Sequence, residues 1–413
     1  MRIEVVKGGL CAVKGVRAYG IKEGNKGLAL IEGKGKAVGM FTSNKIKAAP
    51  VRFTKRQLEK GEGRISAIIA NSGCANSFTG EKGMRNAERM AELVSSSLGV
   101  DKEEVAVAST GPIGKQLDMG LIEKQLGKVV KGITSEGEGG KAAARAIMTT
   151  DTFYKEQVVS IAQTPKPEPQ PDEKVIIGGI AKGSGMIFPH LGLATATMLS
   201  FIYTDADLST EALGRSLKDA VDNSFNMIVV DGDMSTNDMV LLVSTGRSGE
   251  ISEEDFKEGL NSVCKELAKL IAKDGEGATK FVEVRVRGAA SVGDAREVAK
   301  SIVRSPLVKS SIFGESPDLT WGRIIATIGS SSISEDIEPS RITISVKSEK
   351  GKAEKRGLVV KKGEFVDLSG EARNIMEGKE IIIDVDLGIG EEEVEATAWG
   401  CDLSYDYVKI NAG

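Results

Sequence analysis

Apolar residues recur along this chain at spacings that predict both strands and helices. Short, mainly β-branched runs indicate buried strands. Such runs occupy residues 65–70, 105–108, 158–161, 175–177, 227–230, 239–244 and 281–287. Apolar residues three or four positions apart instead predict amphipathic helices. These helices cover residues 83–98, 121–133, 140–148, 209–224, 253–272 and 294–305.

Strand patterns also occur near the two ends of the chain. Residues 1–55 alternate short apolar runs with glycines, which predicts β-structure with turns at 7–9 and 33–35. Further strands are predicted at 324–328, 341–346, 358–361, 380–387 and 393–400. Strands and helices follow one another in mixed order, so we expect an α/β fold with mixed sheets and not a doubly wound Rossmann fold.

Composition narrows the class of partner. The chain has 413 residues, 40% of them hydrophobic and 28% charged, and its net charge is −4. These values are typical of a globular protein with one large core or two domains, and they disfavour a nucleic-acid surface. We therefore expect small-molecule partners. The prolines of residues 164–172 predict an extended, exposed loop.

Cysteines and hydrophobic runs give an expectation about the compartment. The four cysteines lie far apart without a C-x-x-C pair, so neither a zinc site nor a disulfide framework is indicated. The N-terminus lacks an apolar signal core, and the longest apolar run, 188–203, is short for a membrane span. We expect a cytoplasmic protein.

The single histidine, His190, limits the catalytic chemistry. A Ser-His-Asp or Cys-His arrangement would have to use it, and a histidine-rich metal site is impossible. A nucleophile in this chain therefore needs another base, and we expect no metal or redox cofactor.

Three polar segments are candidates for a site. The turn Ser109-Thr110-Gly111 follows a predicted strand and offers backbone N–H groups and a hydroxyl, as an oxyanion hole requires; a plain turn is the alternative. The threonines around Asp151 are more typical of a cap or turn. The acidic loop 231–238 lacks the ligand order of a calcium loop, so we expect its side chains mainly to bond the backbone.

Thr197 is the candidate nucleophile. A threonine hydroxyl becomes a good nucleophile when its residue begins a chain, because the α-amine then serves as the base. Such a terminus arises when the hydroxyl attacks the preceding carbonyl, and the small Ala196 leaves room for that attack. Thr195, which follows Ala194, meets the same condition. Spacing alone leaves open that Thr197 only begins a strand or helix.

The sequence resembles the ornithine acetyltransferases, the glutamate N-acetyltransferases of arginine biosynthesis. The segment 182–187, then Pro189 and then Ala196-Thr197-Met198-Leu199, is similar to their processing motif. Further similar segments lie at 41–45, 71–73, 109–111, 149–152, 274–280, 321–323 and 400–405, so the resemblance covers nearly the whole chain.

The resemblance implies a self-cleaving enzyme with an N-terminal-nucleophile-like α/β/β/α fold. Cleavage between Ala196 and Thr197 would leave an α chain of residues 1–196 and a β chain of 197–413. Thr197 would take the acetyl group of N-acetylornithine as an ester and pass it to glutamate. The family's oxyanion hole matches Thr110 and Gly111. Its substrate contacts match Thr152, Lys182, Thr197, Glu276 and Asn411. The family also implies an α2β2 assembly, and acetyl-CoA as a second donor in bifunctional members.

Three departures from the family pattern keep alternatives open. Residues 191–195 form an insertion, which leaves Thr195 as a minor alternative nucleophile. The chain ends at Gly413, where relatives continue with a hydroxyl-bearing tail, so one substrate contact is expected to be missing. Ser316-Pro317-Asp318-Leu319-Thr320 differs from the usual segment before Trp321, and we interpret the difference as a change in a surface loop. The rival functions are a threonine-nucleophile aminopeptidase or amidase, and a binding protein that is never cleaved.

Overall fold

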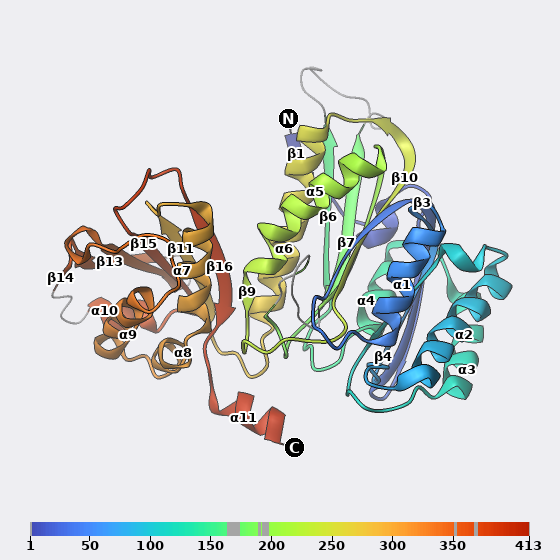
Figure 1. Cartoon of the computed structure of the whole chain (residues 1–413), viewed down its shortest axis with the longest axis horizontal. Coiled ribbons are helices and arrows are strands. Elements are labelled where there is room, and N and C mark those ends of the chain that lie inside the picture. Colours follow the sequence, from blue (N-terminus) through green and yellow to red (C-terminus); the bar gives the residue numbers. More distant parts are fainter. Residues whose placement is uncertain are drawn as a thin grey trace. The chain divides into compact units, whose positions relative to one another are not determined.

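The structure is a computed structural model that describes residues 2–162, 174–188, 191, 198–350, 353–366 and 371–412. It divides into two compact units, Met1–Asn226 with Asp233–Leu267, and Met227–Gly232 with Ala268–Gly413. Each unit is built around one sheet (Figure 1). None of the helices within the described ranges is long and apolar enough to cross a membrane.

The first unit contains a mixed sheet. Along the sheet its strands are β1 (Arg2–Val5), β6 (Lys155–Ala162), β7 (Val175–Lys182), β8 (Leu199–Asp207), β10 (Met239–Glu250), β3 (Lys26–Phe41), β4 (Arg64–Ser72) and β5 (Val105–Thr110), and β2 (Arg17–Glu23) pairs with β3. The pairs β8–β10 and β4–β5 are parallel, and the other pairs are antiparallel. This mixed pairing confirms the predicted α/β class and excludes an all-parallel doubly wound sheet.

Helices cover this sheet on both faces. They are α1 (Ala49–Lys60), α2 (Gly80–Leu98), α3 (Met119–Gly132), α4 (Gly137–Ala146), α5 (Thr210–Asp222) and α6 (Glu253–Lys273). Figure 1 shows α1, α2 and α3 beside β4. Successive residues of β4 enter different apolar clusters, Ala67 and Ile69 with α2 and α3, and Ile68 and Ala70 with α4. Such burial of both faces explains the continuous apolar run of β4.

The second unit has its own sheet. Its strand order is β14 (Glu364–Phe365), β13 (Ala353–Lys361), β12 (Thr343–Lys350), β15 (Glu380–Asp386), β11 (Phe281–Arg287), β16 (Ala396–Cys401) and β9 (Ile228–Val229). The helices are α7 (Val292–Arg304), α8 (Pro306–Phe313), α9 (Pro317–Gly329), α10 (Glu371–Met376) and α11 (Tyr405–Ala412). The amphipathic helix α7 packs its buried face on β11 and β16.

Four predictions of local structure are wrong. Residues 49–55, expected as β-structure, lie in helix α1. Residues 317–320, expected in a surface loop, begin helix α9. Residues 33–35 do not form a turn, because β3 continues through them with a register irregularity between Glu32 and Gly35. A Cβ atom at Gly35 would lie 2.0 Å from the Ser244 carbonyl oxygen, so glycine permits close strand contact here. Residues 324–328 belong to helix α9, in which Trp321, Ile324 and Ile328 are buried at helical spacing. The proline-rich stretch 164–172 lies outside the described residues.

Candidate active site

The turn after β5 is held rigidly by a neighbouring loop. Backbone hydrogen bonds join Cys74 N to the Thr110 oxygen at 3.0 Å, Ala75 N to the Pro112 oxygen at 3.1 Å and Gly114 N to the Ser77 oxygen at 3.0 Å. Gly111 has a φ of +132°, and a Cβ atom there would lie 2.5 Å from Cys74 N. Only glycine fits this conformation and this close contact. The Thr110–Gly111 turn is therefore held in one conformation.

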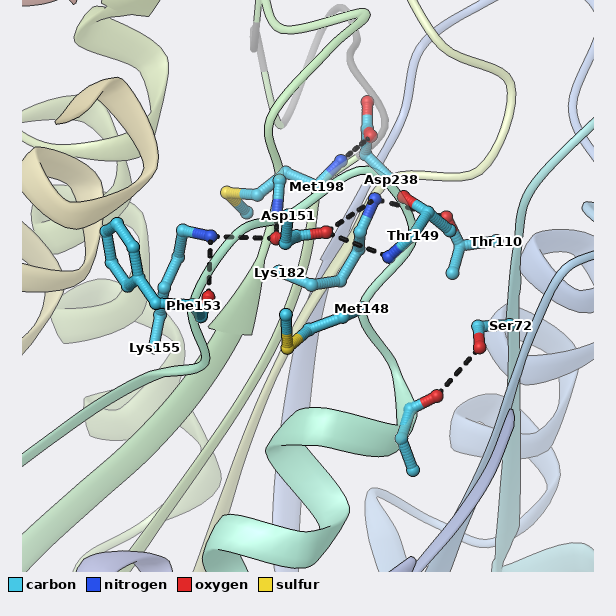
Figure 2. A network of polar contacts seen from close by, with 12 residues as sticks. Ser72, Thr110, Met148, Thr149, Asp151, Phe153, Lys155, Lys182, Met198 and Asp238 are labelled. Atoms are coloured by element: carbon cyan, nitrogen blue, oxygen red, sulfur yellow. Dashed lines mark hydrogen bonds and ion pairs between the residues drawn. The ribbon is translucent and has the colours of Figure 1, made fainter. Parts of the chain in front are cut away.

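Lys182 lies against this turn. It ends β7 and is 2% exposed, and its Nζ donates to Thr110 Oγ1 at 3.3 Å (Figure 2). The same Nζ lies 4.0 Å from Asp151 Oδ2. Because Lys182 donates to the hydroxyl oxygen, the proton of Thr110 is free to point at another acceptor. A cation and a hydroxyl donor are thus combined at the end of two strands.

Asp151 links Lys182 to a second buried lysine. Its Oδ1 accepts from Lys155 Nζ and from Gly183 N, each at 2.8 Å, and its Oδ2 accepts from Thr149 N at 2.9 Å. Burial by itself raises the pKa of Asp151, but the charges of Lys182 and Lys155 outweigh burial and hold the pKa well below its ordinary value. The carboxylate is therefore ionised, and it does form the expected turn contact with Thr149.

The loop before β10 connects the elements of the site. Asn237 Nδ2 donates to the Ala75 oxygen at 2.6 Å and to the Ser109 oxygen at 2.8 Å. The next residue, Asp238, accepts a hydrogen bond from Met198 N through its Oδ1 (Figure 2). The expectation that the side chains of this acidic loop mainly bond the backbone is thus confirmed for Asn237 and Asp238. Sequence reasoning nevertheless missed both as members of the site.

Asp238 has an unusual environment for an acid. It is fully buried, and its Oδ2 has no hydrogen-bond partner among the described residues. Burial raises the pKa of Asp238 well above its ordinary value, and the bond from Met198 N and the charge of Lys182 oppose this rise only in part. The surroundings of Asp238 therefore oppose its ionisation, in contrast to those of Asp151.

Of the remaining predicted site residues before residue 227, the structure describes Thr152 only. Thr152 is exposed and follows Asp151 in the connection between α4 and β6. Thr197, Ala196, the alternative nucleophile Thr195 and His190 lie outside the described residues. Met198, which follows Thr197 in the sequence, is described and fully buried. The role of each predicted site residue stays a prediction.

Glu276 and Asn411 contact each other in the second unit. Asn411, in the C-terminal helix α11, donates from Nδ2 to Glu276 Oε2 at 2.8 Å. Ser404, the residue just before this helix, donates from its Oγ to the Gly277 oxygen at 2.6 Å. Gly277 has a φ of +69°, and a Cβ atom there would lie 2.4 Å from Tyr407 N. This close packing fixes the Glu276 carboxylate beside the amide of Asn411.

No cluster of histidine, cysteine and acidic side chains that could hold a metal ion occurs within the described ranges. The four cysteines are present as free thiols. The described part of the site contains hydroxyl, ammonium, carboxyl and backbone N–H groups. These groups suit acyl transfer through a tetrahedral intermediate.

Comparison with known proteins agrees with the resemblance seen in the sequence. The ArgJ family model matches residues 13–413. A protein of Methanosarcina mazei called glutamate N-acetyltransferase is 51% identical, with 98% of each chain covered. The arginine biosynthesis bifunctional protein ArgJ of Staphylococcus epidermidis is 42% identical, with 99% of each chain covered. A solved structure of the ArgJ protein of Bacillus halodurans is 41% identical over 52% of this chain and 100% of that chain, with a TM-score of 0.47.

The family model covers nearly the whole chain. Two relatives that align with this chain over almost its full length are more than 40% identical to it. The match includes both compact units, and with them the Thr110 turn, Lys182, Glu276 and Asn411. The chain belongs to the ArgJ family.

Proposed function

We propose that this chain is an acyltransferase of arginine biosynthesis that moves the acetyl group of N2-acetylornithine to glutamate. The proposal is carried by the contact between Lys182 and the Thr110–Gly111 turn, in a chain whose full-length relatives are named glutamate N-acetyltransferase and bifunctional ArgJ. Thr197 is the nucleophile of this proposal, and Thr195 is not, because Met198-Leu199 follows Thr197 directly as in the family motif.

The proposed reaction begins with self-cleavage. The Thr197 hydroxyl attacks the carbonyl carbon of Ala196; the C–N bond breaks, and the hydroxyl proton ends on the released nitrogen. Water then hydrolyses the ester, which leaves a carboxylate on Ala196 and a free α-amine on Thr197. This amine is the base that the chain otherwise lacks, since His190 is its only histidine. Residues 1–196 and 197–413 become the α and β chains.

Acetyl transfer consists of two acyl-transfer steps, first to Thr197 and then to glutamate. The amine takes the proton of the Thr197 hydroxyl, whose oxygen attacks the acetyl carbonyl of N2-acetylornithine. The oxyanion that forms is stabilised by the Gly111 N–H and by the Thr110 hydroxyl, whose proton is free because Lys182 donates to its oxygen. Ornithine leaves with the proton. The amine of glutamate then attacks the acetyl ester and restores the free hydroxyl of Thr197.

Charged side chains would select the amino-acid substrates. Thr152 and Lys182 are proposed to contact the substrate in the first unit, where the Lys182 ammonium complements a carboxylate. Glu276 is proposed to bind the side-chain ammonium of ornithine. The hydrogen bond from Asn411 Nδ2 occupies Glu276 Oε2 and orients the carboxylate for that contact. A carboxylate that is already oriented loses less conformational entropy when it binds.

The finer features of the enzyme are part of the proposal. The α and β chains would remain together because β7 and β8, on either side of the cleavage position, are paired from Lys182–Leu199 to Ile177–Thr204. We expect an α2β2 assembly, no metal or redox cofactor, and a cytoplasmic location that keeps the four free thiols reduced. Acetyl-CoA is a possible second donor.

A glutamate chase tests the transfer. Purified enzyme is mixed with N2-acetylornithine, the ornithine is removed, and intact mass follows the acetylated β chain with and without glutamate. We expect an acetyl ester that persists in buffer and disappears with glutamate as N-acetylglutamate forms. Loss at the same rate without glutamate would establish the rival hydrolase. A Thr197→Ala variant is the control, because it should neither cleave nor acquire the acetyl group.

A further inference from the structure

The register of two parallel strands places Asp238 beside Met198. In the β8–β10 pair, Met239 lies opposite Leu199, so the residues just before these strands are neighbours as well. Met239 N donates to the Met198 oxygen at 3.1 Å, and Met198 N donates to Asp238 Oδ1. Both backbone polar groups of Met198 are therefore bound by two consecutive residues, Asp238 at the end of the loop and Met239 at the start of β10.

The same loop holds the oxyanion turn. Asn237 is 1% exposed, and its Nδ2 donates to the carbonyl oxygens of Ala75, in the loop packed against Gly111, and of Ser109, near the end of β5. Asn237 and Asp238 thus connect the donors of the oxyanion hole with the peptide group that Thr197 forms with Met198. The position of Met198 relative to the oxyanion turn therefore depends on these two side chains.

The second carboxyl oxygen of Asp238, Oδ2, accepts no hydrogen bond in the described part of the chain. Oδ2 is fully buried and unpartnered there, and such burial of a polar atom is costly. The α-nitrogen of residue 197 is three covalent bonds from Met198 N, so it lies within about 3.7 Å of that atom in every backbone conformation. A carboxyl group that binds Met198 N with one oxygen can reach the neighbouring nitrogen with the other.

We propose that Asp238 is a positioning residue with two functions, which rest on the proposed function of Thr197. Oδ1 fixes the Thr197–Met198 peptide relative to the oxyanion turn during self-cleavage. Oδ2 accepts a hydrogen bond from the α-amine once cleavage has released it, and so directs the lone pair of that amine toward the hydroxyl. The step involves no net change in Asp238, because the proton moves only between the Thr197 oxygen and nitrogen.

Two substitutions at Asp238 distinguish the roles of its two carboxyl oxygens. Asp238→Ala removes both, so we expect self-cleavage to slow by about 100-fold, the cost of a misplaced reacting group. Asp238→Asn keeps an acceptor for Met198 N but replaces Oδ2 with a donor. We therefore expect this variant to cleave at nearly the wild-type rate, and its cleaved form to show about tenfold lower kcat with unchanged KM.

Asp205 provides a matched control. It lies at the other end of β8, is also fully buried, and also accepts backbone bonds, from Ile176 N at 2.8 Å and Lys14 N at 3.4 Å. Asp205→Asn should lower the thermal midpoint as much as Asp238→Asn while leaving self-cleavage and kcat unchanged. A shared loss of activity in both variants would mean that general destabilisation is the cause, and would overturn the proposal.

Wild-type cleavage is measured first, so that the two proposals fail separately. An uncut wild-type chain contradicts the proposed function. A cut wild type with Asp238→Ala cleaving at the same rate overturns the positioning role of Oδ1 alone. If Asp238→Ala does not fold, Asp238→Asn decides: a lower kcat at unchanged KM supports the role of Oδ2, and a wild-type kcat overturns it.

Discussion

Gly111→Ala is the sharpest perturbation of the proposed oxyanion hole. The new Cβ atom would lie 2.5 Å from Cys74 N and 2.7 Å from the Gly73 carbonyl carbon, whereas ordinary contacts begin at 3.4 Å. These are main-chain atoms, so the turn must move by about 0.9 Å, besides the cost of a φ of +132° for a residue with a side chain. Such a shift takes the Gly111 N–H out of hydrogen-bond range of the oxyanion.

The expected effect on catalysis follows from the loss of one donor. Removal of an oxyanion-hole donor costs roughly 10²–10³ in kcat, so we expect kcat of the transfer to fall about 100-fold. KM should change little, because the oxyanion exists only in the transition state and intermediate. The positive φ and the contact together should also lower the free energy of unfolding by about 2–4 kcal/mol.

Gly114→Ala is the matched control in the same turn. Gly114 has a φ of +82°, but no atom lies within 4 Å of a Cβ placed there. It should lose only about 1–2 kcal/mol of stability, and its kcat should stay within about twofold of wild type. Initial rates of N-acetylglutamate formation and urea unfolding of both variants test the pair. Equal kcat values for the two variants would refute the assignment of Gly111 to the oxyanion hole.

Three further predictions concern the buried charges. Asp151→Asn leaves Lys155 buried without its carboxylate and should lower the free energy of unfolding by about 3–5 kcal/mol in urea titrations; a loss below 1 kcal/mol would contradict the buried ion pair. Since the folded pKa of Asp151 lies below its ordinary 3.8, its ionic stabilisation is complete above that pH and lost as the pH falls below it. The gap in stability between wild type and Asp151→Asn should therefore stay constant above about pH 4 and narrow as the pH falls further, and a gap that stayed constant at lower pH would refute this linkage. Glu276→Gln should raise KM for N2-acetylornithine about tenfold with little change in KM for glutamate, and an equal rise for both substrates would contradict its assignment to the ornithine ammonium.

Periodicity predicts an element well when its pattern of apolar residues fits only one type of secondary structure. The apolar run of β4 and the amphipathic patterns of α2 and α6 are examples. The predictions for 33–35 and 324–328 were wrong because each sequence pattern is compatible with two structures. Glycine marks both a turn and a close strand contact, and a short isoleucine-rich run suits both a strand and a buried helix.

The site was only partly accessible from the sequence for a similar reason. Thr110, Gly111 and Lys182 stand in motifs that match a family, so they could be singled out before their contact was known. Asn237 and Asp238 acquire their meaning from the register of β8 and β10, which pairs strands that follow one another only after α5 and β9. An acidic loop in sequence does not reveal which backbone group it will meet.

The most direct test of the central proposal is the intact mass of freshly purified protein under denaturing conditions, with N-terminal sequencing of each fragment. We predict two fragments, the second beginning Thr197-Met198-Leu199. A second fragment that began at Thr195 would move the nucleophile by two residues. A chain that remained uncut would contradict the self-processing mechanism and favour a non-catalytic binding protein.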